Sequence, residues 1–337
     1  MRQVGNVEAG RTHKSGLSHQ RQTEAFGDQF MIIRGTTAKF ILFAAAFALS
    51  VSAAQAGDEK PWSLQLQAGT SYDDNVLIEQ IDTTSGGGDV AANLALSAGY
   101  KLVDSKTDKL SIGYDFTQSL HGKLTAFDIQ NHDLSISGST QIDGTTLGAS
   151  YSFYHLLLGG RSFLDLHLVN PSILIPVTPH IFVRGAYMYM YKSFLGSNSN
   201  RSASHHQPEG QVFYFFDDAR AYLQAGGDYE IENANGPEFT YKGYALNTSL
   251  QLPLNVMSRE GKLTASYTYL HRNYDNITPL IGAKRHETRS TFKVGAEVPL
   301  VEKLSFLLDY QHVDSNSNLP SAKYTENVIS GALRYDF

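Results

Sequence analysis

Twelve histidines are the residues of this 337-residue chain best suited to acid–base or nucleophilic chemistry. An acyl hydrolase needs a histidine beside a serine, with a third polar group that orients the imidazole ring. No local motif in the sequence names such a set of three residues. We therefore predict that the chain is not an enzyme and has no catalytic residue. Seven of the histidines lie in or beside the strands predicted below: His132, His155, His167, His180, His271, His286 and His312.

Two groups of neighbouring side chains could bind a metal ion. His205 and His206 are adjacent, but neighbouring side chains in a strand or loop usually diverge. Asp73, Asp74 and Asn75 offer oxygens that suit hard divalent cations or a cation bridge to lipopolysaccharide. The simpler interpretation is that these three residues solvate the start of a loop. We predict no metal site and no cofactor, and the absence of cysteine excludes disulfides and thiolate sites.

Composition excludes further classes of protein. Charged residues make up 18% of the chain, the mean hydropathy is −0.25 and the net charge at pH 7 is −6. No basic block could bind nucleic acid, and no surplus of apolar residues indicates helical membrane spans. The chain contains 19 Tyr and 18 Phe, which recur in short alternating runs. Such runs are typical of strands that are apolar on one face.

One long apolar run stands near the start of the chain, at residues 40–51. Basic residues precede it and Ala54-Gln55-Ala56 follows it, which is the pattern of a secretory signal peptide cleaved before Gly57. A membrane anchor is the alternative. A run of about a dozen apolar residues is short for that role, because a spanning helix needs roughly 20.

This signal divides the chain into three parts. Residues 1–30 are polar and patternless, and we favour Met31 as the true start because a signal peptide would begin there. Residues 31–56 are the predicted signal peptide, with Ala54 and Ala56 at the cleavage site. Residues 57–337 are the predicted mature domain.

The mature part consists of segments of about ten residues in which apolar and polar side chains alternate. This period of two places successive side chains on opposite faces of a sheet. We count about fourteen such segments, an even number of the kind that single-chain membrane barrels use. Only the segment from Leu164 to Pro176 is ambiguous in phase. In the first segment, Trp62, Leu64, Leu66 and Ala68 alternate with Ser63, Gln65, Gln67 and Gly69.

The connections between these segments distinguish a barrel from a soluble sandwich, because they switch between short and long. This is the pattern of short periplasmic turns and longer outer loops. The short set is 104–108, 143–144, 177–179, 217–219, 255–261 and 299–303. The long set is 73–89, 121–128, 157–165, 193–206, 232–239, 275–283 and 314–323.

Aromatic residues near the strand ends also favour a membrane barrel, in which they form girdles at the two interfaces. They are Tyr72, Tyr100, Tyr154, Tyr191, Tyr267, Tyr269, Tyr310, Tyr324, Tyr335 and Phe337.

Charged residues within the strands are predicted to face the lumen, because ionised groups face lipid only at a high free-energy cost. Their signs are mixed, so no ion preference follows. They could set the field of a pore, or pair across strands and fill the interior. The predicted lumen-lining residues are Asp115, Arg184, Arg220, Asp228, Glu230, Arg285, Glu287, Arg289, Lys293, Glu297, Asp309 and Arg334, together with Lys192 and Asp336.

The last strand ends on an aromatic residue and resembles the C-terminal signature of bacterial outer-membrane barrels. In that signature, apolar or aromatic residues occupy alternate positions before a terminal aromatic, and here Ile329, Leu333, Tyr335 and Phe337 fill those places. The resemblance implies recognition by the barrel-assembly machinery.

A narrower resemblance involves the ends of the mature chain. The sequence from Ser71 to Val76, that from Ser315 to Pro320, and Tyr324 with Asn327 are similar to the barrel domain of surface lipoprotein assembly modifiers. Related barrels follow helical repeats in exopolysaccharide export proteins. Those proteins carry a helical-repeat domain before the barrel, whereas here the first strand begins within about five residues of the predicted cleavage site.

The sequence thus predicts an all-β protein, a single antiparallel transmembrane β-barrel of about 14 strands in the bacterial outer membrane. The first functional hypothesis is a porin-like channel or export pore for small solutes or a polymer. The second is a surface or assembly module for a lipoprotein or polysaccharide, and an outer-membrane hydrolase is a distant third. Expected partners are membrane lipid, lipopolysaccharide and the barrel-assembly machinery, and no nucleic acid.

Overall fold

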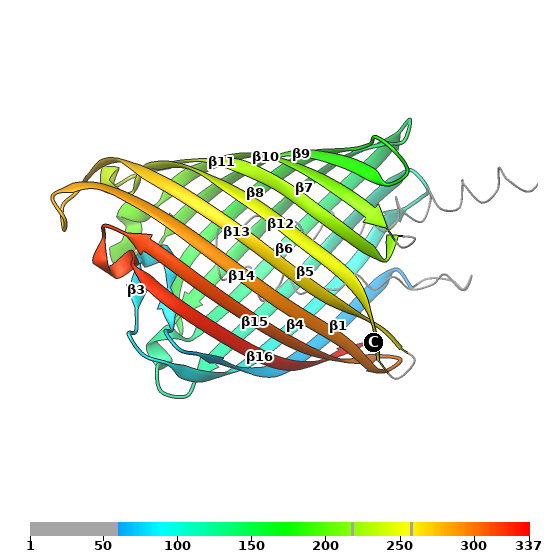
Figure 1. Ribbon diagram of the computed structural model, residues 1–337, viewed down its shortest axis with the longest axis horizontal. Helices are drawn as coiled ribbons and strands as arrows, with labels where there is room; N and C mark the ends of the chain where they lie inside the picture. The colour runs from blue at the N-terminus through cyan, green and yellow to red at the C-terminus, as the bar shows by residue number, and fades with distance from the viewer. Residues whose placement is uncertain (1–59, 217–218, 257–258) are drawn as a thin grey trace, which may run out of the picture.

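The computed structural model describes residues 60–216, 219–256 and 259–337. Fourteen antiparallel strands form one closed barrel, in which each strand is hydrogen-bonded to its neighbours in chain order (Figure 1). The prediction of an all-β antiparallel barrel of about 14 strands is confirmed. The predicted extension at 1–30 and the signal peptide at 31–56, with Ala54 and Ala56, lie outside the described residues.

The strands of the barrel are 12 to 20 residues long. They are β1 (Trp62–Asp73), β4 (Asp89–Asp104), β5 (Asp108–His121), β6 (Ile129–Ile142), β7 (Thr145–Leu158), β8 (Arg161–Pro176), β9 (Ile181–Phe194), β10 (Ala203–Phe216), β11 (Ala221–Ala234), β12 (Tyr241–Val256), β13 (Arg259–Thr278), β14 (Ala283–Val301), β15 (Leu304–Ser317) and β16 (Tyr324–Asp336).

Short elements occupy one end of the barrel. β2 (Leu77–Ile78) and β3 (Thr83–Thr84) form a small separate sheet there. The 3₁₀ helices described at this end are η1 (Glu79–Ile81), η2 (Thr125–Phe127), η3 (Gly196–Arg201), η5 (Pro237–Phe239) and η6 (Pro320–Ala322). No helix in the described ranges is long and apolar enough to cross a bilayer. We call this end the loop end. The opposite end, which holds the turns at 105–107 and 143–144 and the end of β16, is the turn end (Figure 1).

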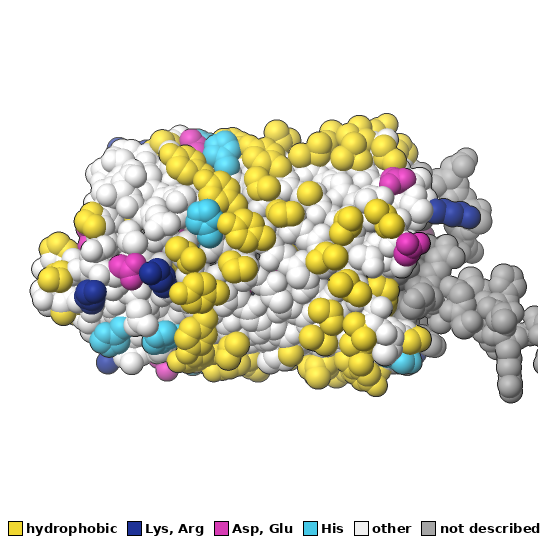
Figure 2. Space-filling model, turned by 90° about the horizontal axis from the view of Figure 1, so that it is seen from above, with side chains coloured by type: hydrophobic (Ala, Val, Ile, Leu, Met, Phe, Trp, Pro, Cys, Tyr) yellow, Lys and Arg dark blue, Asp and Glu magenta, His cyan; other side chains and the backbone are white. Residues whose placement is uncertain are grey.

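Alternation along each strand separates an apolar outside from a polar inside. In β1, Gln65 is 6% exposed and points into the barrel, whereas the neighbouring Leu66 is 44% exposed on the outside. Figure 2 shows hydrophobic side chains spread over the outer surface, with histidines at the edge of one hydrophobic band. The outer wall is therefore built to contact lipid rather than water.

Several connections at the loop end are shorter than the sequence predicted. The chain between β7 and β8 turns at Gly159 and Gly160, whose φ angles of +54° and +75° suit a two-residue hairpin. β13 continues to Thr278, so only four residues join it to β14. Strand pairing thus extends beyond the alternating segments, and His205 and His206 lie in β10 rather than in a loop.

The first connection at the loop end, which we call loop L1 (residues 74–88), folds back on itself. The Val76 amide donates to the carbonyl of Gly87 at 3.3 Å, and the Ser85 amide donates to the carbonyl of Val76 at 2.7 Å. β2, η1 and β3 lie within this loop. Ile78 at its inner end is buried against β7, β8 and β9, so loop L1 lies inside the mouth of the barrel.

The barrel closes where β1 pairs with β16, and the residues of the narrower resemblance reinforce this seam. Both oxygens of Asp74 accept hydrogen bonds from Asn327, one from its amide and one from its side chain, each at 2.7 Å. The Asn75 side chain donates to the carbonyl of Thr325 at 3.0 Å. At the other end of the seam, the Phe337 amide donates to the carbonyl of Leu64 at 3.0 Å.

Gly69 makes this seam possible, because a side chain there would strike β16. A Cβ at Gly69 would lie 2.6 Å from the Cβ of Ala332 and would also clash with the Gly331 carbonyl oxygen. We predict that Gly69→Ala destabilises the refolded barrel by about 1–3 kcal/mol, the usual cost of overpacking. The fluorescence of Trp62, the single tryptophan, reports the urea midpoint from β1 itself.

Gly210→Ala is the matched control. A Cβ at Gly210 would meet no atom within 4 Å, so this variant should unfold at the midpoint of the unchanged protein. Equal midpoints for the two variants would show that the seam does not depend on the close approach at Gly69.

Candidate functional site in the barrel interior

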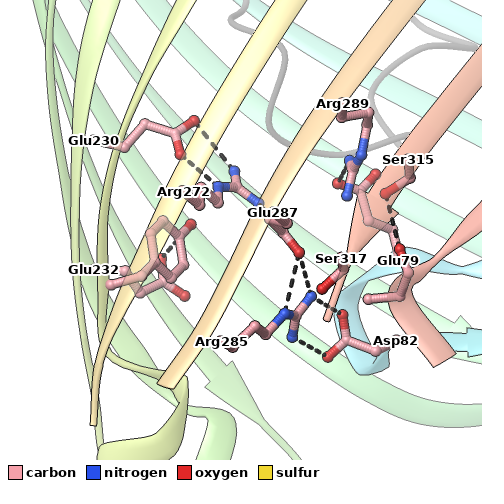
Figure 3. A network of polar contacts seen from close by, with 12 residues as sticks. Glu79, Asp82, Glu230, Glu232, Arg272, Arg285, Glu287, Arg289, Ser315 and Ser317 are labelled. Atoms are coloured by element: carbon pink, nitrogen blue, oxygen red, sulfur yellow. Dashed lines mark hydrogen bonds and ion pairs between the residues drawn. The ribbon is translucent and has the colours of Figure 1, made fainter. Parts of the chain in front are cut away.

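Charged side chains of β11, β13 and β14 meet inside the loop end of the barrel (Figure 3). Arg272 donates from Nε to one oxygen of Glu230 at 2.7 Å and from Nη2 to the other at 3.2 Å. Arg272 also lies 3.6 Å from Glu287 on the neighbouring strand. Because all three are buried, each charge depends on its partners rather than on bulk water.

Two further arginines of β14 bind the acidic residues of loop L1. Arg285 donates to both oxygens of Asp82, at 2.8 and 3.0 Å, and to Glu287 at 2.5 Å. Arg289 lies four residues further along β14, on the same inward face, and is hydrogen-bonded to Glu79. Figure 3 shows Asp82 and Glu79 of the loop facing these two arginines of the wall.

Arg201 of η3 holds loop L1 from another connection at the loop end. Its guanidinium donates to Asp82 and to the carbonyl of Gln80, at 3.0 and 3.1 Å. The same guanidinium stacks over Phe239 at 4.1 Å. Asp82 therefore joins loop L1 to two separate parts of the chain.

Tyrosine rings cover the arginines of the charged wall. Arg272 lies 4.6 Å from the ring centroid of Tyr241, and Arg285 lies 4.4 Å from that of Tyr274. Tyr324 lies 5.9 Å from Arg289. Such contacts stabilise a guanidinium away from water and restrict its orientation.

The other side of loop L1 is apolar. Ile78 packs into a buried cluster of residues that point inward from three adjacent strands: Tyr154, Leu156, Phe163, Leu164, Leu166, Leu168, Met188, Met190 and Phe194. We call this cluster the apolar patch. Loop L1 therefore bridges the mouth, with carboxylates bound to β14 and an apolar residue bound to β7–β9.

Asp82 is ionised at neutral pH. Burial raises the pKa of this carboxyl, but the neighbouring Arg285 and Arg201 lower it by a larger amount. The pKa of Asp82 therefore lies below its ordinary value. At pH values above the ordinary carboxyl pKa, ionised Asp82 therefore stabilises the folded loop. This stabilisation is lost as the pH falls through the lowered pKa of Asp82 in the folded protein.

Other residues of the sequence-predicted set lie inside the barrel as local groups. Arg184 pairs with Glu209 at 2.5 Å and Arg334 with Glu297 at 2.5 Å. Lys192 and His205 share Glu232, at 2.7 and 2.8 Å. The inward sides of their strands also carry Asp115, which accepts a hydrogen bond from Ser97, and Asp228, Lys293, Asp309 and Asp336.

Arg220 does not belong to this interior set. It precedes β11 at the turn end, its side chain is 48% exposed, and it lies 3.8 Å from the carboxylate of Glu260. The prediction that Arg220 faces the lumen is wrong because β11 begins at Ala221, so the alternation of inward and outward side chains does not extend to Arg220. Tyr154 and Tyr324 also face the interior, so they are not part of an aromatic girdle.

The two groups considered as metal sites have other roles. His205 points inward to Glu232 at 2.8 Å, whereas His206 points outward and its Nδ1 lies 2.5 Å from the Tyr187 hydroxyl. Asp74 and Asn75 are committed to the β1–β16 seam. Across the ranges that the structure describes, no group of three or more histidines and carboxylates is arranged to hold a metal ion.

Sequence reasoning missed the residues of loop L1 and η3 that complete the charged network. Glu79, Asp82 and Arg201 fall in segments that were predicted to be exposed outer loops. One signal was present, because Val76-Leu77-Ile78 is an apolar run within such a loop. Val76, Leu77 and Ile78 are all buried in the structure, whereas Glu79, Asp82 and Arg201 are partly buried.

The outer surface shows how the barrel lies in a membrane. Several outward histidines lie where the outer surface of a strand changes from apolar to polar. In β6, the outward side chains are Leu134 on the side of the membrane centre, His132 at the boundary, and Gln130 on the side of the loop end. His132 and His167 each lie within hydrogen-bonding distance of a tyrosine hydroxyl on the neighbouring strand, at 2.8 and 2.9 Å. The closed strands, apolar outer wall and polar interior are those of a transmembrane β-barrel, the architecture of bacterial outer-membrane proteins. Because short turns face the periplasm in bacterial outer-membrane barrels, we expect the loop end to face outward.

Known proteins resemble the chain only at low sequence identity. No family model and no curated protein matches the chain. Similar solved structures include OccAB3 of Acinetobacter baumannii, at 9% identity and a TM-score of 0.46, with 82% of this chain and 99% of that chain covered. The anion-selective porin of Comamonas acidovorans has 9% identity, a TM-score of 0.46 and coverages of 82% and 98%. OmpT of Vibrio cholerae has 10% identity, a TM-score of 0.49 and coverages of 82% and 97%. At these values the comparisons add no argument about function.

The contacts of Asp82 predict how loop L1 responds to mutation and pH. In an Ile78→Cys background, which provides the only cysteine, a water-soluble maleimide should react slowly at pH 7 because position 78 is buried. Asp82→Asn should raise the labelling rate by about tenfold or more, since charged hydrogen bonds to Arg285 and Arg201 are lost. In the loop that keeps Asp82, the same release is expected as the pH falls below the ordinary carboxyl pKa toward the lowered pKa of Asp82, with each labelling rate divided by that of a free thiol at the same pH. Asp82→Asn should weaken this pH dependence, and Glu79, which binds Arg289, accounts for what remains.

Glu260→Gln is the control, because it removes only the exposed pair with Arg220. Its labelling rate should equal that of the Ile78→Cys background. Fast labelling in that background itself would contradict the packing of loop L1 against the apolar patch.

Proposed function

We propose that the protein is a passive outer-membrane channel for small polar solutes, narrowed at its outer mouth by loop L1. The observation that carries this proposal is a closed barrel of fourteen strands with charged side chains on its inner wall. Eight strands already leave an interior that side chains can fill, and the diameter grows with strand number. We therefore expect fourteen strands to enclose more space than the side chains of the wall occupy.

The contacts of loop L1 support a narrowed rather than a wide pore. Asp82 and Glu79 lie against Arg285 and Arg289 on one side, and Ile78 lies against the apolar patch on the other. A solute that enters from outside meets both signs of charge in paired form. The channel should therefore select by size more than by charge.

One observation favours the second hypothesis, a barrel that acts as a surface or assembly module. Loop L1 is held by ion pairs from both β14 and η3, which is the arrangement expected of a mouth that stays closed. In that case the connections at η2, η3, η5 and η6 would bind the partner. The resemblance to assembly modifiers belongs to this alternative.

Single-channel recording of the refolded protein in planar bilayers tests the proposal. We expect discrete openings in the unchanged protein, and a larger unitary conductance when Glu79→Gln and Asp82→Asn are combined, because the loop then leaves the mouth. Replacement of residues 77–84 by a glycine–serine linker should enlarge the pore further.

The Glu260→Gln variant should conduct like the unchanged protein, since Glu260 lies at the turn end. A barrel that passes the heat-modifiability test of folding yet stays silent, with and without loop L1, would overturn the channel proposal and favour the assembly module.

A further inference from the structure

A serine, a histidine and an aspartate come together on the outer face of the β7–β8 hairpin. The Nε2 atom of His155 lies 3.2 Å from the Ser162 hydroxyl, and its Nδ1 lies 2.6 Å from a carboxylate oxygen of Asp165. The carboxylate of Asp165 thus orients the imidazole ring of His155, and the opposite nitrogen of the ring faces the hydroxyl of Ser162. This is the set of contacts by which a histidine activates a serine nucleophile.

An irregularity in β8 places these side chains together. The register between β7 and β8 shifts between Leu156 and Leu157, so that His155 pairs with Asp165 while Leu157 pairs with Ser162. Phe163 and Leu164 both point inward, at 5% and 2% exposure. Strict alternation would put Ser162 and Asp165 on opposite faces, whereas the bulge puts both on the outside.

The three side chains lie at the level where the outer surface changes from apolar to polar. His155 is directly opposite His132 across the β6–β7 pair. Leu134, one outward position nearer the membrane centre than His132, is 60% exposed. The side chains of His155 and Asp165 are 33% and 29% exposed, so a molecule in the outer leaflet can reach them. The ester bonds of acylated lipids lie at this same junction between hydrocarbon and head groups.

The partners of His155 differ from those of three other outward histidines. His132, His167 and His206 each contact a tyrosine hydroxyl through Nδ1, at 2.8, 2.9 and 2.5 Å. Those contacts suit anchoring at the interface. His155 instead has a carboxylate at Nδ1 and a serine hydroxyl at Nε2. Anchoring does not require this combination.

We propose that Ser162, His155 and Asp165 form an acyl-hydrolase site for acyl-ester lipids of the outer leaflet. The site lies on the outside of the wall and is independent of the proposed channel. It contradicts the sequence prediction that the chain is not an enzyme.

The reaction is ester hydrolysis, with water as the second substrate. The Ser162 oxygen attacks the ester carbonyl as its proton moves to Nε2 of His155, and the carbon–oxygen bond to the lipid alcohol then breaks. The alcohol leaves with the proton from His155. Water, deprotonated by His155, attacks the acyl-serine, and release of the fatty acid returns the proton to Ser162. Asp165 orients the ring throughout, through its contact with Nδ1.

The test uses the refolded full-length protein in mixed micelles of detergent and phospholipid. We expect release of fatty acid, and covalent labelling of Ser162 by a fluorophosphonate probe that is located by mass spectrometry. Ser162→Ala and His155→Asn should each lower the rate of release by about 100-fold or more and abolish the labelling. Asp165→Asn should lower both to a smaller extent, because the ring loses its orientation but not its nitrogen atoms.

His167→Asn is the matched control. His167 is an outward histidine on β8, the strand of Ser162 and Asp165, and its ring contacts the hydroxyl of Tyr151. It should release fatty acid at the unchanged rate. Heat-modifiability establishes that each variant is folded, and single-channel conductance should be the same in Ser162→Ala as in the unchanged protein. A folded protein that releases no fatty acid above the Ser162→Ala background and leaves Ser162 unlabelled would overturn the proposal, whatever the conductance shows.

Discussion

The structure depends on the closure of β1 against β16. In lipid no water can satisfy the backbone amides and carbonyls of a free edge strand, so a sheet is stable there only when its two edges pair with each other. The first and last strands of the chain make this pairing, and Asp74 and Asn327 reinforce it at the loop end. Gly69 allows the close approach that the pairing requires.

Closure creates an interior with its own electrostatic demands. Charges that face this interior are largely removed from water, and Arg272, Arg285 and Arg289 are therefore each bound to carboxylates. Loop L1 supplies two of those carboxylates, so the loop and the wall depend on each other. The same ion pairs that compensate the charges of the arginines in the mouth also hold the loop across it.

Because side chains alternate along a strand, one wall can carry two unrelated sites. In β8, Leu166 and Leu168 belong to the interior apolar patch, while Asp165 and His167 face the lipid side. The bulge at Phe163 and Leu164 changes this phase locally and brings Ser162 to the outer face. A change of a single residue in register is sufficient to assemble a chemical group that regular pairing would separate.

The sequence by itself determined the architecture. A period of two over about fourteen segments specifies which face of each strand meets lipid, and this local property does not depend on distant contacts. The same period also placed most of the predicted lumen-lining residues on the inner face, for example Glu230, which binds Arg272. Tertiary structure alone decided where loop L1 lies, because its position depends on Arg285 and Arg201, which are more than 100 residues away in the chain. It also decided the phase of β8, since a bulge is fixed by pairing with β7 and leaves no periodic signal in the residues themselves.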